Sequence, residues 1–300
     1  MTDEEKDREF RSGFVSIIGR PNVGKSTLLN SILGEKVSIV TPKPQTTRNR
    51  IRGIKTLPAE QIIFIDTPGI HKPRHKLGDT MVKTALEAFK EVDIILFMVE
   101  PHDTEKGDKF IIKFLEEAQT PVFLLINKID TVKKLELLPL IDRLKEFYPF
   151  KEIIPISALK QDGIEILLKK IYDYLPPGPK YYSDDIITDQ LERFMVSEII
   201  REKATEMTEE EIPYSIVVEV IEWKEKESGL ILIMSNIYVE RDSQKGIIIG
   251  KGGRMLKAIG TAARADIEKL LNTKVFLELW VKVKKDWRDN RKTLEELGYK

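Results

Sequence analysis

Apolar and polar positions in the first half of the chain alternate in the manner of a layered α/β domain. The runs at 92–100 and 122–126 are almost continuously apolar, which is typical of parallel strands covered on both faces. Shorter β-rich runs predict further strands at 13–18, 51–57, 61–65 and 153–156. Helical spacing predicts helices at 27–33 and 163–175. This order predicts a domain in which strands and helices alternate.

The second half has a different order of elements. Its pattern predicts a helix at 190–205, strands at 214–223 and 229–240, an isoleucine-rich turn at 246–253, a helix at 254–271 and a strand at 274–283. Leu175-Pro176-Pro177-Gly178-Pro179 separates the halves, because proline cannot continue a helix. We therefore expect two domains, 1–178 and 179–300, which also suits a chain of 300 residues.

The composition is that of a globular protein, with 41% hydrophobic residues and a formal net charge of zero. The absence of cysteine excludes a disulfide framework and thiol catalysis. The densely charged start, residues 1–11, lacks the apolar core of a signal peptide, and no apolar run is long enough to span a membrane. We therefore expect a cytoplasmic protein.

A phosphate-binding pattern, G-x-x-x-x-G-K-[ST], lies between a predicted strand and a predicted helix. Glycines let the backbone curl until successive N–H groups point at one anion, and the helix dipole adds to the attraction. Lys25 would reach the terminal phosphates of a nucleotide, and the Ser26 hydroxyl would bind Mg²⁺. Taken alone, the pattern could also be an ordinary glycine turn. The predicted phosphate-binding residues are Gly19, Arg20, Pro21, Asn22, Val23, Gly24, Lys25, Ser26 and Thr27.

Two later segments offer the remaining groups of a nucleotide switch. The loop at 35–50 carries two prolines and several hydroxyls, and Thr47, with Thr46 as the fallback, is the candidate Mg²⁺ ligand. The strand at 61–65 ends in Asp66-Thr67-Pro68-Gly69. The Asp66 carboxylate can hold the water shell of Mg²⁺, and the Gly69 N–H can meet the γ-phosphate. In isolation such a tetrapeptide is more often a plain turn.

Asn127-Lys128-Ile129-Asp130 follows the strand at 122–126 and predicts a guanine site. An asparagine side chain can bond the O6 or N7 edge of a purine, and a lysine stem can lie over the ring. The Asp130 carboxylate can accept two hydrogen bonds, and guanine offers two donors where adenine does not. Ser157-Ala158-Leu159, after the last predicted strand, would close over the base with backbone N–H groups.

Together these segments resemble the five motifs of the TRAFAC GTPases, in order and in spacing. The resemblance implies a doubly wound, mostly parallel sheet, with the nucleotide at the carboxyl ends of the strands. It also implies GTP and GDP as ligands and Mg²⁺ as the cofactor. The catalytic residues that it implies are Lys25, Thr47, Asp66 and Gly69.

The sequence departs from the best-known small GTPases at Ile70, where they carry a glutamine that orients the attacking water. It resembles instead a branch with a hydrophobic residue there, several members of which use K⁺ near the asparagine of the phosphate loop, here Asn22. We include Ile70 among the phosphate-binding residues, with Asp66, Thr67, Pro68 and Gly69, and expect slow hydrolysis, on the order of 10⁻⁴ to 10⁻² s⁻¹ by analogy with Ras and Gα. Arg20 and Arg48 are either catalytic arginines or solvated surface.

A Gly-x-x-Gly segment, Gly250 to Gly253, precedes the helix predicted at 254–271 and resembles the nucleic-acid loop of the KH module. The element order resembles KH type II, an α+β domain. Residues 181–240 carry fifteen acidic and five basic residues, whereas 241–292 carry fourteen basic and six acidic ones, which favours phosphate binding by the later part. The predicted single-stranded RNA site comprises Gly250, Lys251, Gly252, Gly253, Arg254, Lys257, Lys282, Lys284, Lys285, Trp287 and Arg288; Trp287 would either stack on a base or pack internally.

A GTPase domain followed by a KH type II domain resembles the Era GTPases over essentially the whole chain. The resemblance implies a monomer that binds the 3′ end of 16S ribosomal RNA, with GTP in control, during assembly of the small ribosomal subunit. It also implies peripheral association with the inner membrane, although no segment reads as a lipid anchor. Two alternatives remain: an RNA-binding module with a purely structural nucleotide site, and a GTPase directed to tRNA or translation.

Overall fold

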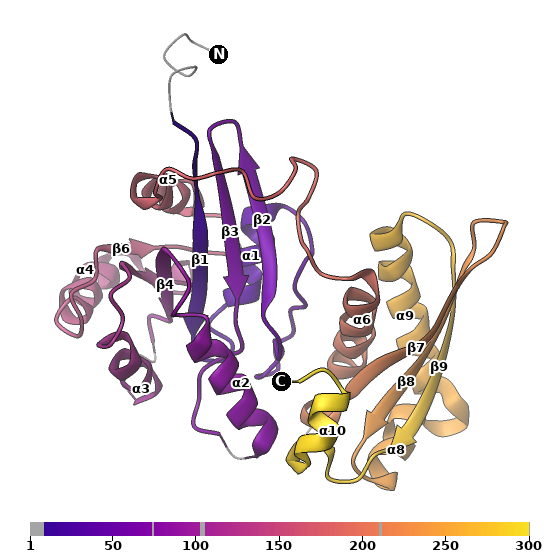
Figure 1. The fold of residues 1–300 in the computed structure, drawn as a ribbon. Coiled ribbons are helices and arrows are strands. Elements are labelled where there is room, and N and C mark those ends of the chain that lie inside the picture. Colours follow the sequence, from indigo (N-terminus) through magenta and orange to yellow (C-terminus); the bar gives the residue numbers. More distant parts are fainter. Residues whose placement is uncertain (1–8, 74, 103–105, 210–211, 300) are drawn as a thin grey trace. The chain divides into compact units, whose positions relative to one another are not determined.

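The computed structural model describes residues 9–73, 75–102, 106–209 and 212–299, and internal contacts divide them into two units (Figure 1). Unit 1 contains the described residues up to Ser38, Thr47–Pro73 and those from Gly78 to Asp189. Unit 2 contains Ile39–Thr46, residues 75–77 and the described residues from Gln190 onward. Each unit has its own sheet.

The sheet of unit 1 has six strands in the order β2-β3-β1-β4-β5-β6. The strands are β1 (Arg11–Gly19), β2 (Ile51–Leu57), β3 (Glu60–Asp66), β4 (Ile94–Val99), β5 (Val122–Ile126) and β6 (Glu152–Pro155). Only the β2–β3 pair is antiparallel, and every other pair of neighbours is parallel. The chain winds outward from β1 in both directions, which is the doubly wound order that the sequence predicts.

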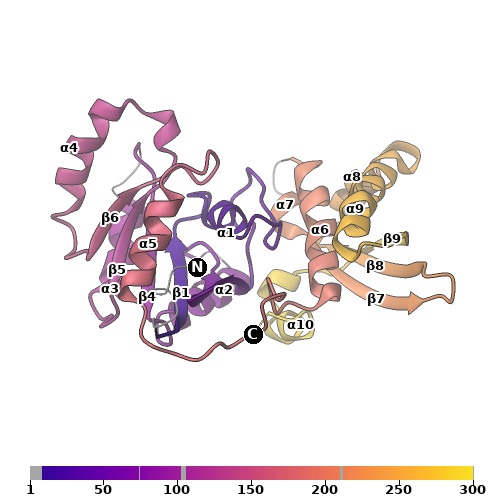
Figure 2. The same ribbon diagram turned by 90° about the horizontal axis from the view of Figure 1, so that it is seen from above.

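Helices cover both faces of this sheet (Figures 1 and 2). They are α1 (Lys25–Leu33), α2 (Lys76–Glu87), α3 (Lys106–Leu115), α4 (Lys134–Leu144) and α5 (Ile164–Tyr174). Helices α2, α3 and α4 contribute to one apolar cluster with Phe97 and Leu124 of the sheet. Phe123 points to the opposite face, because side chains alternate along a strand, and packs edge-to-face on Tyr174 of α5.

The segment after Gly178 belongs to unit 1 as far as Asp189, so the contacts divide the chain later than the boundary predicted after Gly178. The Ser12 hydroxyl donates to the Pro179 carbonyl at 2.6 Å, and the Ile54 N–H donates to the Ile187 carbonyl at 2.7 Å. The polar connector is thus held along the sheet by hydrogen bonds to its backbone carbonyls, which its residue types do not reveal.

Unit 2 has a three-stranded sheet, β7-β8-β9, in which β7 is antiparallel and β9 parallel to β8. Its elements are α6 (Glu192–Glu206), α7 (Ile212–Ser215), β7 (Val217–Glu225), β8 (Ile231–Val239), α8 (Asp242–Ile249), α9 (Arg254–Leu271), β9 (Val275–Val283) and α10 (Arg291–Glu296). The turn predicted at 246–253 is wrong in its first part, because 242–249 form helix α8, whose Ile248 is completely buried. Burial of the Ile248 side chain stabilises helix α8. The sequence did not suggest a helix here, because the apolar run is short and has glycine on both sides.

One face of the unit 2 sheet is covered by α6 and α9 (Figure 2). Alternate residues of β8, including Ile233 and Ile237, are buried in a cluster with Ile200 of α6 and Ile259 of α9. None of the helices formed by the described residues is long and apolar enough to cross a membrane.

Glu60, the first residue of β3, is a buried carboxylate with an oxygen, Oε2, that has no hydrogen-bond partner. Arg11 stands opposite it in the β1–β3 register, but the Arg11 guanidinium donates to the Leu175 carbonyl and lies over the Tyr172 ring. Burial therefore raises the pKa of Glu60 from 4.5 to about 7.

We expect this group to make unit 1 less stable as the pH rises from 4.5 to 7. The unfolded chain loses the Glu60 proton first in this window, whereas the folded protein retains it, so unfolding becomes more favourable. Glu60→Gln should remove the effect and gain about 1–3 kcal/mol over wild type between pH 4.5 and 8. Urea unfolding at pH 4.5 and at pH 7 measures the free energy of unfolding of wild type and variant. The exposed Glu116→Gln is the control variant. The prediction would be contradicted if Glu60→Gln differed from wild type by the same free energy of unfolding at both pH values.

Candidate functional site

The predicted nucleotide motifs lie at one edge of the unit 1 sheet. Gly19 ends β1, Asp66 ends β3, Asn127 follows β5 and Ser157 follows β6. These strands are parallel, so their carboxyl ends meet at the same edge. The crevice beside this edge is where doubly wound sheets bind ligands.

The phosphate loop turns into α1 at Gly24, whose φ of 102° lies in the left-handed region that favours glycine. A Cβ at this position would lie 2.3 Å from Asn127 Nδ2, so the loop also requires glycine for space. Asn22 has a positive φ of 66°, which asparagine tolerates better than most residues. The loop therefore has the curled backbone that the sequence predicts for an anion cradle.

Lys25 is buried at the start of α1. Its ammonium donates to the Arg20 carbonyl at 2.8 Å and to the Gly19 carbonyl at 3.3 Å. Burial lowers the pKa of Lys25 from 10.5 to about 8, although the Asp66 carboxylate partly opposes this shift. A desolvated cation held only by carbonyl oxygens is well suited to receive phosphate oxygens.

Asp66 is completely buried, and three hydroxyls converge on its Oδ2. Ser26 Oγ lies at 2.6 Å, Ser38 Oγ at 2.9 Å and Thr47 Oγ1 at 3.4 Å. Burial raises the pKa of Asp66, while Lys25 and these hydroxyls oppose the rise. Its other oxygen, Oδ1, has no hydrogen-bond partner.

This donor set fits Mg²⁺, a hard cation that prefers oxygen ligands. The Ser26 and Thr47 hydroxyls lie 2.8 Å apart, so both can reach one ion, and the unpaired Oδ1 of Asp66 can hold its water shell. Thr46 is not part of this group, since its hydroxyl donates to the Lys43 carbonyl. Among the groups found here, Ser38 was not predicted; no motif marks it.

Ser38 is positioned by Asn30 of α1. The Asn30 Oδ1 accepts from the Ser38 N–H at 2.9 Å and from the Val37 N–H at 3.0 Å, and its Nδ2 donates to the Ser38 carbonyl at 2.7 Å. One amide side chain thus fixes the turn that presents the Ser38 hydroxyl to Asp66.

The Asn127 side chain joins three loops. Its Nδ2 donates to the Val23 carbonyl at 2.7 Å, and its Oδ1 accepts from the Ala158 N–H at 2.9 Å. The side chain is buried and joins the phosphate loop to the loop after β6. One of the two Nδ2 hydrogens remains for a purine edge, so the predicted hydrogen bond from Asn127 to the base stays a prediction.

The remaining residues predicted to hold guanine surround this connection. Lys128 has a φ of 65°, donates to the Asn22 carbonyl at 2.9 Å and pairs with Glu100. Asp130, in the short 3₁₀ helix Ile129–Thr131, is exposed and accepts from the Ser157 hydroxyl at 2.6 Å. Leu159 is also exposed and offers an apolar surface beside the loop. Ile129 packs partly on the sheet cluster.

The loop after β3 lies against the phosphate loop. A Cβ on Gly69 would come within 2.6 Å of the Pro21 nitrogen, and the Thr67 hydroxyl donates to the Ile17 carbonyl. Ile70 was predicted among the phosphate-binding residues. Its N–H donates to the Gly19 carbonyl at 3.0 Å, and its side chain is buried in the sheet cluster. Pro68 is buried and lies two residues after the end of β3.

Neither arginine considered for catalysis is solvated surface. Arg20 Nε donates to Asp108 Oδ1 at 2.9 Å, and the Asp108 side chain is only 2% exposed. This ion pair holds the Arg20 side chain on α3. Arg48 is buried, with 3% of its surface exposed. The sequence contained no pattern that would reveal the Asp108 or Glu100 pairings, because both partners lie far from the motifs in the chain.

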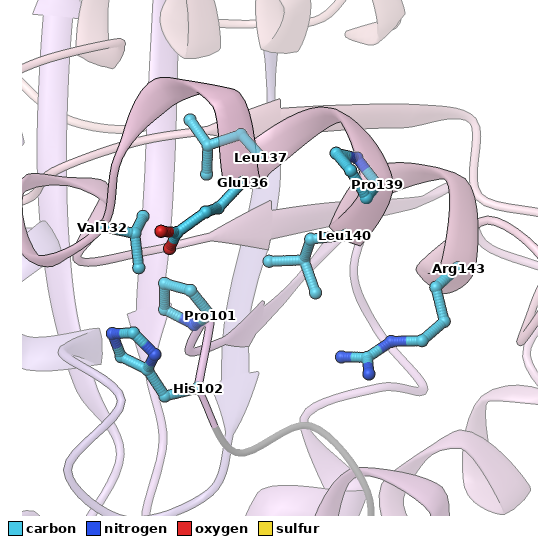
Figure 3. Close-up of a pocket in the computed structure, with 8 residues that line it drawn as sticks. All are labelled: Pro101, His102, Val132, Glu136, Leu137, Pro139, Leu140 and Arg143. Carbon is cyan, nitrogen blue, oxygen red and sulfur yellow. The ribbon is translucent and has the colours of Figure 1, made fainter.

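A separate hollow of about 360 Å³ lies beside α4 (Figure 3). Pro101 and His102 follow β4 and face Glu136 and Leu140 of α4. The predicted nucleotide-binding residues do not line it, so this hollow is not the nucleotide site.

In unit 2, the Gly-x-x-Gly loop joins α8 to α9. Gly252 has a φ of 61°, and a Cβ there would meet no heavy atom within 4 Å. Gly253, the N-cap of α9, is equally unobstructed. Lys251, Arg254 and Lys257 beside the loop are all exposed. The loop thus offers open backbone flanked by cations, whereas Gly250 packs closely against Met255.

Several of the residues predicted to bind RNA after β9 are placed differently. Trp287 is completely buried, its indole N–H donates to the Ser215 carbonyl at 2.9 Å, and it stacks on Tyr299, so stacking on a base is wrong. Arg288 forms an ion pair with Glu240.

The three lysines of this segment also differ from one another. Lys284 pairs with Glu296 and lies over the Tyr238 ring, and Lys285 is exposed. Lys282 is exposed on the face of the sheet that α9 does not cover, because it alternates with the covered Val281 and Val283. The alternation of apolar residues predicted strand β9. A run of cations in the sequence does not reveal on which face of the sheet each side chain lies.

Gly24→Ala should abolish measurable binding of guanine nucleotide, because the new Cβ would overlap Asn127 Nδ2 and displace the amide that joins the loops. We expect at least a hundredfold loss of GTP and GDP affinity, about 3 kcal/mol, by calorimetry. Gly34→Ala is the control: Gly34 has a φ of 76° but a Cβ there meets nothing within 4 Å, so only backbone strain changes. Equal losses in both variants would contradict this account.

Two family models match this chain, one in each half. A family model described as a 50S ribosome-binding GTPase matches residues 14–128, and a KH domain model matches 211–288. GTPase Era of Ruminiclostridium cellulolyticum is 56% identical over 97% of this chain and 98% of that protein. GTPase Era of Geobacter metallireducens is 58% identical over 98% of this chain and 99% of its own.

Two solved structures are similar over both units, each with a TM-score of 0.94 and covering 97% of this chain and 99% of the other. One, 45% identical, is Era in complex with MgGDPNP and nucleotides 1506–1542 of 16S ribosomal RNA. The other, 44% identical, is a variant of Aquifex aeolicus Era bound to GDP and aluminium fluoride. Since the curated relatives exceed half identity over nearly their full length, this chain belongs to the Era family of GTPases.

Proposed function

We propose that this GTPase binds the 3′ end of 16S ribosomal RNA through unit 2 and acts as a cytoplasmic monomer in assembly of the small ribosomal subunit. The observation that carries the proposal is the unobstructed backbone at Gly252 and Gly253 beside three exposed cations. The similar Era structure that holds nucleotides 1506–1542 of this RNA supports the choice of ligand.

The residues of unit 1 suit hydrolysis of GTP that is slow without a partner. Lys25 would bind the β- and γ-phosphates, and Ser26 and Thr47 would hold Mg²⁺, which supplies charge neutralisation when bound. Ile70 is buried and cannot orient water. The Gly69 backbone would therefore meet the γ-phosphate without a side chain to position the nucleophile, which favours a long-lived GTP state.

A short segment gives a route for coupling between nucleotide and RNA. Ile39–Thr46 belongs to unit 2, where the Val40 N–H donates to Glu202 at 3.0 Å and Arg201 donates to the Thr46 carbonyl at 2.6 Å. Its two chain neighbours, Ser38 and Thr47, both contact Asp66. Ligation of Thr47 would thus bear on a segment that is hydrogen-bonded to α6.

Gly252→Asp should weaken binding of RNA at least tenfold, because a carboxylate would occupy the open approach to the backbone and repel phosphate. The probe is a synthetic RNA with the sequence of the 16S 3′ end, measured by fluorescence anisotropy at two salt concentrations. Gly229→Asp is the matched control, since Gly229 also has a positive φ, no neighbour within 4 Å and an exposed position. Unchanged affinity in Gly252→Asp, or preference for tRNA, would refute the proposal.

Nucleotide and RNA should each tighten the binding of the other by one and the same factor, as linkage requires. We expect a non-hydrolysable GTP analogue to raise RNA affinity by about 5- to 150-fold relative to GDP, the usual range of such coupling. Titration of each ligand with and without the other measures both factors. Val40→Pro, which removes the N–H that donates to Glu202, should reduce them. A factor of one in both directions would leave two independent domains.

Potassium should accelerate hydrolysis relative to sodium if the Asn22 side chain helps to hold it beside the phosphate loop. Asn22→Ala should then equalise the rates in KCl and NaCl. Asn272→Ala is the control, because Asn272 also has a positive φ but ends α9 in unit 2. Identical wild-type rates in both salts would remove the potassium proposal and leave the GTPase assignment intact.

A further inference from the structure

The face of the unit 2 sheet that α6 and α9 do not cover exposes large apolar side chains. Phe276 and Trp280 of β9 are each 53% exposed, and Ile221, at an irregularity in β7, is 47% exposed. Phe276 and Trp280 lie on one side of β9 because they are four residues apart. Clusters of exposed aromatic and aliphatic groups of this kind mark interaction sites.

The strand register defines this surface, which we call the outer face. Residues of β8 at its centre pair directly with residues of β7 on one side and of β9 on the other. Its members in register are Val217, Glu219, Glu222 and Lys224 of β7, Leu232, Met234, Asn236 and Tyr238 of β8, and Phe276, Glu278, Trp280 and Lys282 of β9. The exposed Ile221 lies beside Glu222, at the irregularity in β7.

The middle of the outer face is rich in hydrogen-bond acceptors. In one row Asn236 lies between Glu219 and Trp280, and in the next Met234 lies between Glu222 and Glu278. Lys224 pairs with Glu222, but Glu219 and Glu278 form no ion pair among the described residues. The outer face therefore contains two carboxylates that form no ion pair among the described residues, although Lys224 and Lys282 lie on the same face.

Asn236 adds a third acceptor. Its side chain is 2% exposed, its Nδ2 donates to the Tyr238 hydroxyl at 3.0 Å, and its Oδ1 has no partner. Tyr238 in turn donates to Glu219 at 2.9 Å. The Tyr238 hydroxyl proton is used on Glu219, and ionised carboxylates only accept, so a group that meets Glu219 and Glu278 must supply donors.

We propose that the outer face docks a protein segment that carries arginine or lysine among apolar side chains. The guanidinium of arginine offers five donors and stacks on tryptophan, which suits carboxylates beside Trp280. RNA fits less well, because its phosphates would meet Glu219 and Glu278. The cations beside the Gly-x-x-Gly loop lie on other elements, so RNA and this protein segment would use separate surfaces of unit 2. The proposal does not depend on which RNA is bound.

Photocrosslinking in cells tests which molecule occupies the outer face. p-Benzoylphenylalanine replaces Phe276 in the full chain, and the same group replaces Leu138, which is 69% exposed in unit 1, as the control. We expect an adduct from position 276 to an identified protein, through a peptide that contains arginine or lysine. An adduct to RNA, to a second copy of this chain or to an acidic peptide, or no adduct above the control, overturns the proposal.

Charge reversal then tests the chemistry with the purified crosslinked protein as the probe. The double variant Glu219→Lys, Glu278→Lys should lower its affinity at least tenfold in calorimetry. The control double variant Glu116→Lys, Glu165→Lys makes the same change in net charge at exposed positions of unit 1 and should retain affinity. GTP turnover and the melting temperature establish that both variants fold. Equal affinities of the two double variants overturn the proposal even where the crosslink is found.

Discussion

The carboxylate of Asp66 is completely buried, and a charge in that position is costly unless other groups compensate for it. Lys25 and three hydroxyls supply part of the compensation, but one oxygen has no partner among the described residues. A cation bound beside this oxygen would supply the rest of the compensation. The loops after β1 and β3 and the segments around Ser38 and Thr47 must all be in place for this arrangement, which makes the site sensitive to the order of those segments.

The residues that contact phosphate and magnesium could be predicted because their chemistry is local. A glycine-rich turn between a strand and a helix fixes where Lys25 and Ser26 point, and parallel strands bring Asp66 to the same edge. The structural role of Asn127 could not be predicted in the same way. Its residue type suits a purine edge, but its neighbours in space, Val23 and Ala158, lie far away in the chain, so the sequence did not reveal that the amide also joins two loops.

In unit 2 the alternation of apolar residues predicts the strands, but it does not reveal which face of the sheet each side chain lies on. Strand β9 was predicted from its alternation, yet only the pairing with β8 shows that Phe276 and Trp280 face away from the helices. The basic segment after β9 was predicted as one RNA surface, whereas burial of Trp287 against Ser215 divides its residues among packing, ion pairing and exposure. Charge counts describe a segment, and tertiary contacts decide the role of each side chain in it.

Because side chains alternate along a strand, the Gly-x-x-Gly loop and the outer face lie on separate surfaces of unit 2. A three-stranded sheet with helices on one face must leave its other face exposed or covered by something else. The Gly-x-x-Gly loop belongs to the helical layer, since it joins α8 to α9, whereas Trp280 belongs to the opposite face. Ile39–Thr46, which connects Ser38 to Thr47, is hydrogen-bonded to α6 of this helical layer. The helical layer therefore contains both that contact and the Gly-x-x-Gly loop, whereas the outer face presents Glu219 and Glu278, which would repel phosphate.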